Sequence, residues 1–270
     1  MSDTPWQGDA CSLVEEFRTG RRTPLEELQA TYAAIEASTL NAFCHLPREQ
    51  AEAAARAADV SKPFGGVPIG VKELDQVEGW PDTHASVPLK DPVAGHTGTM
   101  VQRIRDDGGA VLMGLTTASE FGGVNVTRTK LHGTTHSPWQ HGKTPGGSSG
   151  GTAAAVAGGL VTLGTAGDGG GSIRIPAGFT GMVGLKATIG RIPRGPRAQY
   201  GNLTVTIGCI SRSVRDTARW FDLTNGFDAR DPLSLPARPD GRQAWARTCQ
   251  RCAARASRSP RTGVPPRSPR

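Results

Sequence analysis

The chain has 270 residues, with 36 glycines, 20 prolines, 5 cysteines and a formal net charge of +7. This length allows one large domain or two small ones, with a substantial hydrophobic core. The glycines cluster and do not repeat at a fixed period, which excludes a collagen-like chain or a linker. No apolar run approaches the roughly 18 residues of a membrane helix, so no membrane partner is expected.

The positive charge is concentrated at one end of the chain. Residues 238–270 contain nine arginines and one acidic residue, whereas residues 1–237 contain 22 basic and 23 acidic residues. The body of the protein therefore gives no electrostatic reason to expect nucleic acid as a partner. The N-terminus shows neither the basic nor the apolar segment of a secretory signal. Five scattered cysteines fit a reducing compartment, so we expect a cytoplasmic protein.

The first 58 residues predict a helical scaffold. A short helix is expected over residues 10–19, ended by Gly20. Thr23, Pro24 and Glu26 then have the pattern of an N-cap, a first-turn proline and a capping-box acid, which predicts a helix to about residue 37. A strand is expected at 41–46 and an alanine-rich helix at 48–58.

Lys72 directly follows a predicted strand in which Val67, Ile69 and Val71 alternate with smaller residues. Two interpretations stay open for this lysine. A solvated strand end is the commoner case. At a buried strand end, desolvation lowers the pKa of a lysine and makes the neutral amine available as a base.

The middle of the chain predicts part of an α/β layer, with a helix over 97–109 and a buried strand over 110–115. The next 25 residues, 119–143, are a long polar stretch, and loops of this length are often functional. Its three histidines, His132, His136 and His141, do not have the spacing of a zinc site. We interpret them as surface or substrate-proximal loop residues and expect no metal.

Two glycine-rich segments surround serines in the stretch from Thr144 to Thr188. The first is GGSSGG at 146–151, and the second is DGGGS at 168–172. A helix within 151–161 and strands at 160–165 and 181–186 are expected around them, followed by an outer helix at 213–225. Such segments also occur as phosphate-binding turns, but the GxxxxGK[ST] pattern is absent.

The serines and Lys72 together suggest acyl transfer, which requires a nucleophile, a base and donors for the oxyanion. We predict Ser172 as the nucleophile, Lys72 as the base and Ser148 as a proton relay between them. The backbone N–H groups of 169–172 are predicted to form the oxyanion hole, because three glycines there impose no side-chain clash.

Three segments, 65–72, 144–151 and 168–186, resemble the amidase signature family. The resemblance implies a Ser–cis-Ser–Lys triad of Ser172, Ser148 and Lys72, with a cis peptide bond between residues 147 and 148. It also implies that Gly169, Gly170 and Gly171 form the oxyanion loop and that Ser149 contributes to substrate binding. The implied fold is α/β, with a central mixed β-sheet flanked by helices and no cofactor.

The resemblance covers about residues 8–236 and stops there, although members of the family are considerably longer. We therefore predict a domain over 1–236, the N-terminal part of the family's fold with its catalytic core, and a disordered arginine-rich tail over 237–270. The tail's composition fits either a basic tail or a shifted reading frame, and the second fits better. Its Cys249 and Cys252 lack the second pair of a zinc site.

The predicted function is hydrolysis of a linear carboxylic amide to carboxylate and ammonia through an acyl-serine. The substrate is expected to be a small-molecule amide that the sequence does not name, and a homodimer is left open. One alternative is a truncated, inactive amidase fragment. Another is a glutamyl-tRNA amidotransferase A-like subunit, although Ile175 stands where those subunits tend to have glutamine.

Overall fold

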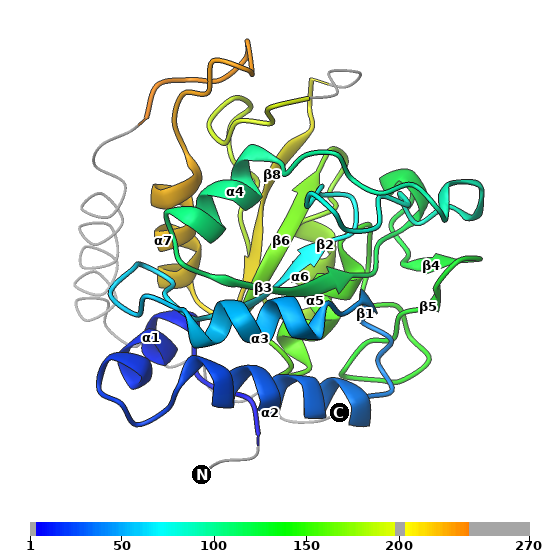
Figure 1. Cartoon of the computed structure of the whole chain (residues 1–270). Helices are drawn as coiled ribbons and strands as arrows, with labels where there is room; N and C mark the ends of the chain where they lie inside the picture. Colours follow the sequence, from blue (N-terminus) through cyan, green and yellow to red (C-terminus); the bar gives the residue numbers. More distant parts are fainter. Residues whose placement is uncertain (1–3, 198–202, 238–270) are drawn as a thin grey trace, which may run out of the picture.

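A six-stranded mixed β-sheet forms the centre of the structure, a computed structural model that describes residues 4–197 and 203–237 (Figure 1). The strands lie in the order β1-β3-β2-β6-β8-β7. Their bounds are β1 Phe43–His45, β2 Pro68–Lys72, β3 Val111–Thr116, β6 Leu163–Asp168, β7 Val183–Gly184 and β8 Thr206–Ser211. A separate small hairpin joins β4 (Arg128–Thr129) to β5 (Gly133–Thr134).

The middle of the sheet is parallel and its flanks are antiparallel. β2 pairs in parallel with β3 and with β6, whereas β1 pairs antiparallel with β3, and β8 antiparallel with both β6 and β7. Every residue of β2 and β3 is buried, as expected for central strands that are covered on both faces. The predicted α/β fold with a central mixed sheet is confirmed.

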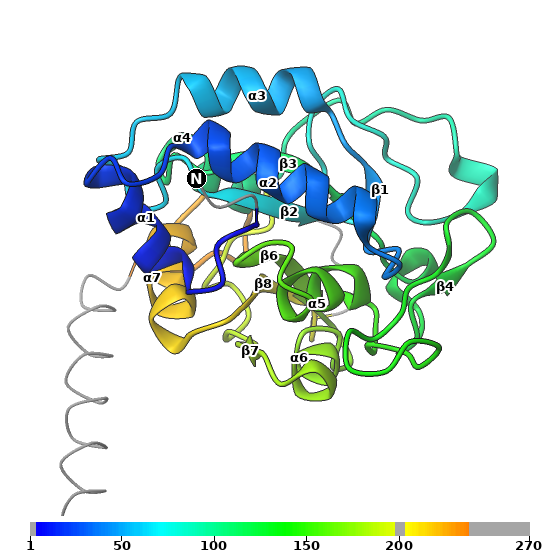
Figure 2. The ribbon, with the colours of Figure 1, turned by 90° about the horizontal axis from the view of Figure 1, so that it is seen from below.

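Helices surround this sheet (Figures 1 and 2). One core cluster joins the sheet to α1, α4 and α7, a second joins it to α2, α3 and α5, and a third lies between α5, α6, β6 and β8. The helices are α1 Ala10–Arg18, α2 Pro24–Ala37, α3 Arg48–Arg56, α4 Thr99–Asp106, α5 Gly150–Ala157, α6 Arg174–Thr180 and α7 Val214–Thr224. Two 3-10 turns, η1 (Val87–Leu89) and η2 (Glu120–Gly122), lie in the loops.

The N-terminal helices follow their capping signals closely. The Thr23 hydroxyl accepts a hydrogen bond from the N–H of Glu26 at 3.2 Å, and the Glu26 carboxylate accepts one from the N–H of Thr23 at 2.8 Å. This reciprocal pair is the predicted capping box, and it satisfies two N–H groups that a helix N-terminus leaves unpaired. The predicted helices at 10–19, 24–37 and 48–58 are confirmed, to within two residues at their ends.

Two elements near the serines differ from the expectation. Helix α6 was not predicted, because Pro176 and Gly178 lie inside it; proline is tolerated there because the N–H groups of a first turn have no intrahelical partners. Strand β8 was not predicted either, since its short sequence TIGCIS gains its partners only by pairing with the distant β6. The strand expected at 181–186 is reduced to the two residues of β7.

No helix among residues 4–197 and 203–237 is both long and apolar enough to cross a membrane. The predicted tail, with its pair of cysteines at 249 and 252, lies outside the described residues from 238 onward. The boundary at 236 stays a prediction.

Candidate active site

Lys72 is the last residue of β2, and the structure buries it. The residue is only 3% exposed, and its backbone N–H donates a 2.7 Å hydrogen bond to the Thr165 hydroxyl of the neighbouring β6. The side chain therefore leaves the sheet from a fixed point in its parallel centre. Of the two interpretations left open for this lysine, the desolvated one fits the structure.

Burial lowers the pKa of Lys72 to about 8. The charged ammonium loses its hydration in the interior, which favours the neutral amine. The carboxylates of Asp75, Glu73 and Asp168 act in the opposite direction and keep the pKa from falling further. A lysine with a pKa near 8 has a substantial neutral fraction at slightly alkaline pH and can accept a proton there.

Ser148 lies directly opposite the Lys72 amine. The Lys72 Nζ donates a hydrogen bond of 2.7 Å to Ser148 Oγ, and both residues are buried. The peptide bond between Gly147 and Ser148 is cis, as the resemblance to the amidase signature family implied. Glycine is required at 147, because a Cβ there would lie 2.7 Å from the backbone nitrogen of Val126.

Ser172 follows β6 and precedes α6, and it faces the same pocket as Ser148 and Lys72. Within the described residues its hydroxyl has no hydrogen-bond partner, and none joins it directly to the Ser148 hydroxyl. The two serine loops are nevertheless connected, since the N–H of Ser149 donates to the Ser172 carbonyl at 3.3 Å. Gly171 beside it has φ +115°, a conformation that other residues rarely adopt.

The predicted oxyanion donors differ in availability. The N–H of Gly171 donates to Asp168 Oδ1 at 2.8 Å, so the loop itself uses this donor, contrary to the prediction. In the part of the chain that the structure describes, the N–H groups of Gly169, Gly170 and Ser172 have no acceptor, and all three residues line the pocket.

Ser149 occupies a supporting position. It is fully buried, and its hydroxyl lies 3.4 Å from both the carbonyl oxygen and the backbone nitrogen of Gly167. The residue does not line the pocket that contains Ser148 and Ser172. The Ser149 side chain thus bonds to Gly167 near the end of β6, and its contribution to substrate binding stays a prediction.

Asp168 organises the Ser172 loop, and the sequence analysis gave it no role. Its carboxylate accepts hydrogen bonds from the N–H groups of Gly171, Ile173 and Arg174 and from two nitrogens of the Arg174 guanidinium. Burial alone would raise the pKa of Asp168, but these hydrogen bonds outweigh it and hold the pKa at about 2. An aspartate immediately before a glycine turn, with an arginine six residues later, was the available signal.

Replacing Asp168 with asparagine is expected to remove an acid-sensitive part of the stability. The folded-state pKa lies below the usual 3.8, so the carboxylate stabilises the fold above about pH 4, and this contribution disappears as the pH falls toward 2. Its size is at most about 2 kcal/mol, because the Arg174 partner is half-exposed and screened by water. Urea unfolding at pH 7, 4 and 3 measures it. The difference between wild type and Asp168→Asn should shrink by about half at pH 3, and parallel stability curves would contradict the assignment.

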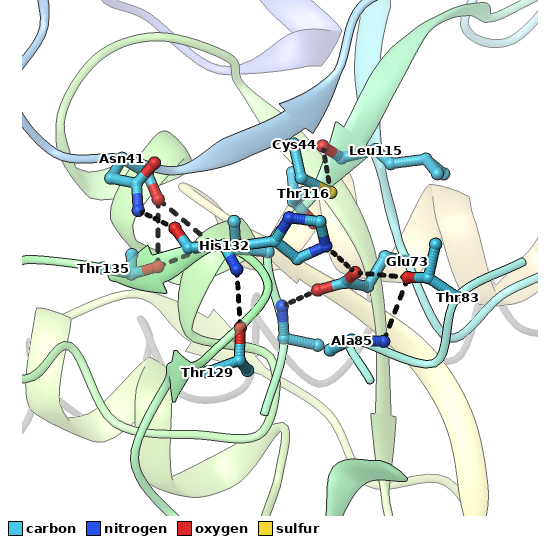
Figure 3. A network of polar contacts seen from close by, with 12 residues as sticks. Asn41, Cys44, Glu73, Thr83, Ala85, Leu115, Thr116, Thr129, His132 and Thr135 are labelled. Atoms are coloured by element: carbon cyan, nitrogen blue, oxygen red, sulfur yellow. Dashed lines mark hydrogen bonds and ion pairs between the residues drawn. The ribbon is translucent and has the colours of Figure 1, made fainter. Parts of the chain in front are cut away.

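Glu73, the residue after Lys72, is the centre of a second buried network (Figure 3). Its Oε1 accepts the N–H of Ala118 at 2.6 Å, and its Oε2 lies 2.8 Å from His132 Nε2 and accepts the Thr83 hydroxyl at 3.2 Å. The network thus ties three loops to the end of β2. Cys44 lies beside it, and burial, followed by the charge of Glu73, raises the pKa of its thiol well above the usual value.

Cys44, Glu73 and His132 form a group whose potential metal-ligating atoms lie within 4.8 Å of one another. The ligand types would suit zinc. Hydrogen bonds already use both carboxylate oxygens of Glu73 and the facing nitrogen of His132, so we interpret the group as a polar anchor. The other two predicted loop histidines, His136 and His141, stack on each other at 3.9 Å between ring centroids, away from the pocket.

Substituting Glu73 with alanine is expected to destabilise the fold by about 3 kcal/mol. The change leaves the Ala118 N–H and the Thr83 hydroxyl without their acceptor in a buried environment. Chemical unfolding measures the loss, with Glu49→Ala as a matched control, because Glu49 is exposed and should change stability by less than about 0.5 kcal/mol. Equal stabilities of the two variants would show that the Glu73 hydrogen bonds do not stabilise the fold.

The pocket around the triad residues has a volume of about 680 Å³ and opens to solvent. Lys72, Ser148 and Ser172 line it together. The remaining lining is mixed, with apolar side chains such as Leu74, Met100 and Ile207 beside charged and polar ones such as Asp75, Asn125 and Arg194. A concave site with a few converging polar groups and a lysine of lowered pKa is the usual form of a small-molecule active site.

Comparisons with known proteins identify the family of this chain. A model of the Amidase family matches residues 26–266 of this sequence. The chain belongs to the amidase family. Among curated relatives, the A subunit of glutamyl-tRNA(Gln) amidotransferase from Rhodopirellula baltica is 38% identical over 247 residues, which cover 88% of this chain and 49% of the relative. The same protein from Nitratiruptor sp. is 42% identical over 169 residues, or 63% of this chain and 38% of the relative.

Solved structures of amidase-family enzymes share the fold. A 6-aminohexanoate cyclic dimer hydrolase with bound substrate aligns with a TM-score of 0.82 at 34% identity, over 87% of this chain and 50% of the other. A bacterial aryl acylamidase of the amidase signature family aligns with a TM-score of 0.79 at 32% identity, over 88% and 51%. The chain spans about half the length of the curated relatives it matches.

Proposed function

We propose that this amidase-family chain hydrolyses a carboxylic amide to carboxylate and ammonia through an acyl-Ser172 intermediate. The observation that carries the proposal is the buried pair of Lys72 and Ser148, 2.7 Å apart, in one pocket with the unpaired hydroxyl of Ser172. A desolvated amine beside a serine can activate a nucleophile without a histidine.

The proton path follows from this order of residues. Neutral Lys72 accepts the proton of the Ser148 hydroxyl, and Ser148 accepts the proton of Ser172 as its oxygen attacks the amide carbon. The developing oxyanion is stabilised by the free N–H groups of Gly169, Gly170 and Ser172, each contributing on the order of 3 kcal/mol. The proton on Lys72 then returns through Ser148 to the leaving nitrogen. In the second half of the reaction, water attacks the acyl carbon and gives its proton to Ser148 and Lys72. The bond to Ser172 Oγ then breaks, this proton returns to the Ser172 oxygen, and the carboxylate is released.

Labelling with a fluorophosphonate probe tests this assignment directly. The probe phosphorylates an activated serine and needs no knowledge of the natural amide. Wild type should be labelled at Ser172, as located by peptide mass spectrometry, and Ser172→Ala should remain unlabelled. A folded wild-type sample that takes up no probe would refute the active-enzyme proposal and favour the inactive-fragment alternative.

A second candidate is the role of an A subunit in an amidotransferase, supported by the curated relatives that carry this name at 34–42% identity. The structural similarities favour a stand-alone hydrolase, because the A subunit of the Thermotoga maritima amidotransferase aligns with a TM-score of 0.73, below the two hydrolases described above. Glutaminase activity that appears only with a tRNA-bound partner would support the amidotransferase role. Turnover of simple amides by the chain alone would exclude it.

A further inference from the structure

Two loops place aromatic rings at the mouth of the proposed amidase pocket. His84 comes from the loop at 83–86 and Phe121 from η2, and both line the pocket that contains Ser148 and Ser172. The loops are joined by a hydrogen bond of 2.9 Å from the Phe121 N–H to the His84 carbonyl. Their rings stack, with centroids 6.0 Å apart and an interplanar angle of 20°.

The backbone of both loops is held in a costly conformation. His84, Ala85 and Phe121 have φ values of +46°, +59° and +52°, in the left-handed region that residues other than glycine rarely adopt. Three of the four such residues in the described chain therefore lie in these two loops, and two of them, His84 and Phe121, line the pocket. Conformations of this kind persist only where the surrounding structure fixes them, and they cluster at active sites and ligand clamps.

The buried network around Glu73 supplies that fixation (Figure 3). Thr83 donates its hydroxyl to Glu73 Oε2 and accepts the N–H of Ala85 at 3.1 Å, which holds the first loop. The Ala118 N–H bonds to Glu73 Oε1, which holds the start of the second loop. One carboxylate thus sets the distance between the two loops and, through the adjacent Lys72, their distance from the catalytic base.

The second loop also contacts Ser148, the serine proposed as the proton relay. The Ser119 N–H donates to the Ser148 carbonyl at 3.2 Å, and a Cβ on Gly122 would lie 3.4 Å from Ser148 Oγ. Phe121 lies between these two contacts, yet its residue is 61% exposed. A phenyl ring that lines the pocket and is open to solvent contributes little to the core and can contact a ligand.

We propose that the rings of His84 and Phe121 form a fixed aromatic wall of the substrate pocket, and that the preferred substrates carry a planar unsaturated group next to the scissile amide. Aromatic faces favour offset or edge contacts with other flat rings beyond simple area burial. A saturated ring of the same size fills the space but lacks the flat face. The inference rests on the proposed function only in that it places the amide carbonyl at Ser172.

Ligand binding to Ser172→Ala tests the wall without any turnover. Isothermal titration calorimetry compares benzamide with cyclohexanecarboxamide, two primary amides of similar size and different planarity. The Ser172→Ala protein, the parent of the other variants, should bind benzamide about two- to tenfold more tightly than cyclohexanecarboxamide. Adding His84→Asn or Phe121→Asn should remove most of this preference, because asparagine tolerates the left-handed backbone but has no ring. Phe121→Tyr should keep it.

Phe227→Asn is the matched control, because Phe227 is equally exposed at 63% and lies outside this pocket; it should leave the preference unchanged. A parent without the preference, or one that binds neither amide, would overturn the inference, as would a preference that survives both asparagine variants. If these variants unfold, the comparison of Phe121→Tyr with Phe121→Leu decides in the same way.

Fluorophosphonate labelling of the wild type separates this inference from the proposed function. Labelling at Ser172 together with equal binding of the two amides would support the proposed amidase activity and refute the aromatic wall. Tighter binding of benzamide by a protein that takes up no probe would support the aromatic wall and refute the proposed activity.

Discussion

Replacing Ser172 with alanine is expected to lower kcat for amide hydrolysis by a factor on the order of 10⁶, which leaves only the turnover that binding and the oxyanion donors provide. The size follows from the covalent path, because without the Ser172 oxygen no acyl-enzyme forms and the base has no nucleophile to activate. The unpaired hydroxyl faces the pocket, so its removal breaks no hydrogen bond among the described residues and should not disturb the fold. Release of ammonia from a panel of primary amides measures the effect.

The matched control for this variant is Ser61→Ala. Ser61 is exposed and its hydroxyl bonds only to Asp59, so the kcat of this variant should equal that of wild type. A Ser172→Ala protein that retains more than about a tenth of the activity would show that another group attacks the amide. Ser148→Ala distinguishes the relay from the nucleophile, since a relay variant should still be labelled slowly by a fluorophosphonate.

The sequence predicted best those parts of the fold that local patterns determine. The capping box from Thr23 to Glu26 and the apolar strand that ends in Lys72 involve neighbours in the chain, so propensity and periodicity suffice. Strand β8 shows the opposite case. Its residues become a strand because they pair antiparallel with β6, some 40 residues earlier, and no local signal carries that information.

The same division holds for the site. Ser148, Ser172 and Lys72 were predicted from residue types and from the resemblance, and the structure places Lys72 against Ser148. The hydrogen-bonding role of Asp168 was not predicted, although it decides that the Gly171 N–H turns away from the pocket. Glu73 was also missed, because its partners Ala118 and His132 are distant in sequence and only the folded sheet brings them together.

The pH dependence of catalysis should report the state of Lys72. Since the base must be neutral to accept a proton, kcat/KM should rise about tenfold per pH unit below the pKa and level off above about pH 8. Burial is the main cause of the lowered pKa, so the midpoint should lie well below the usual value of 10.5. Initial rates between pH 6 and 10 give the profile. A flat profile over this range would argue against Lys72 as the base.

Lys72→Met should remove this pH dependence and lower kcat/KM by about 10²- to 10⁴-fold, the usual contribution of a general base.

The same substitution should raise the free energy of unfolding. A folded-state pKa of about 8 against 10.5 means that charging the buried amine costs about 3 kcal/mol at pH 7, a cost that disappears as the pH rises from 8 toward 10.5. Methionine avoids this cost but leaves the Ser148 hydroxyl without its partner, a loss of about 1 kcal/mol. The variant should therefore be about 2 kcal/mol more stable at pH 7 than wild type, with Lys90→Met, at an exposed residue, as the control. A residue that costs stability where it is needed for activity is in a catalytic position, whereas a Lys72→Met protein that is both inactive and less stable would identify the lysine as structural.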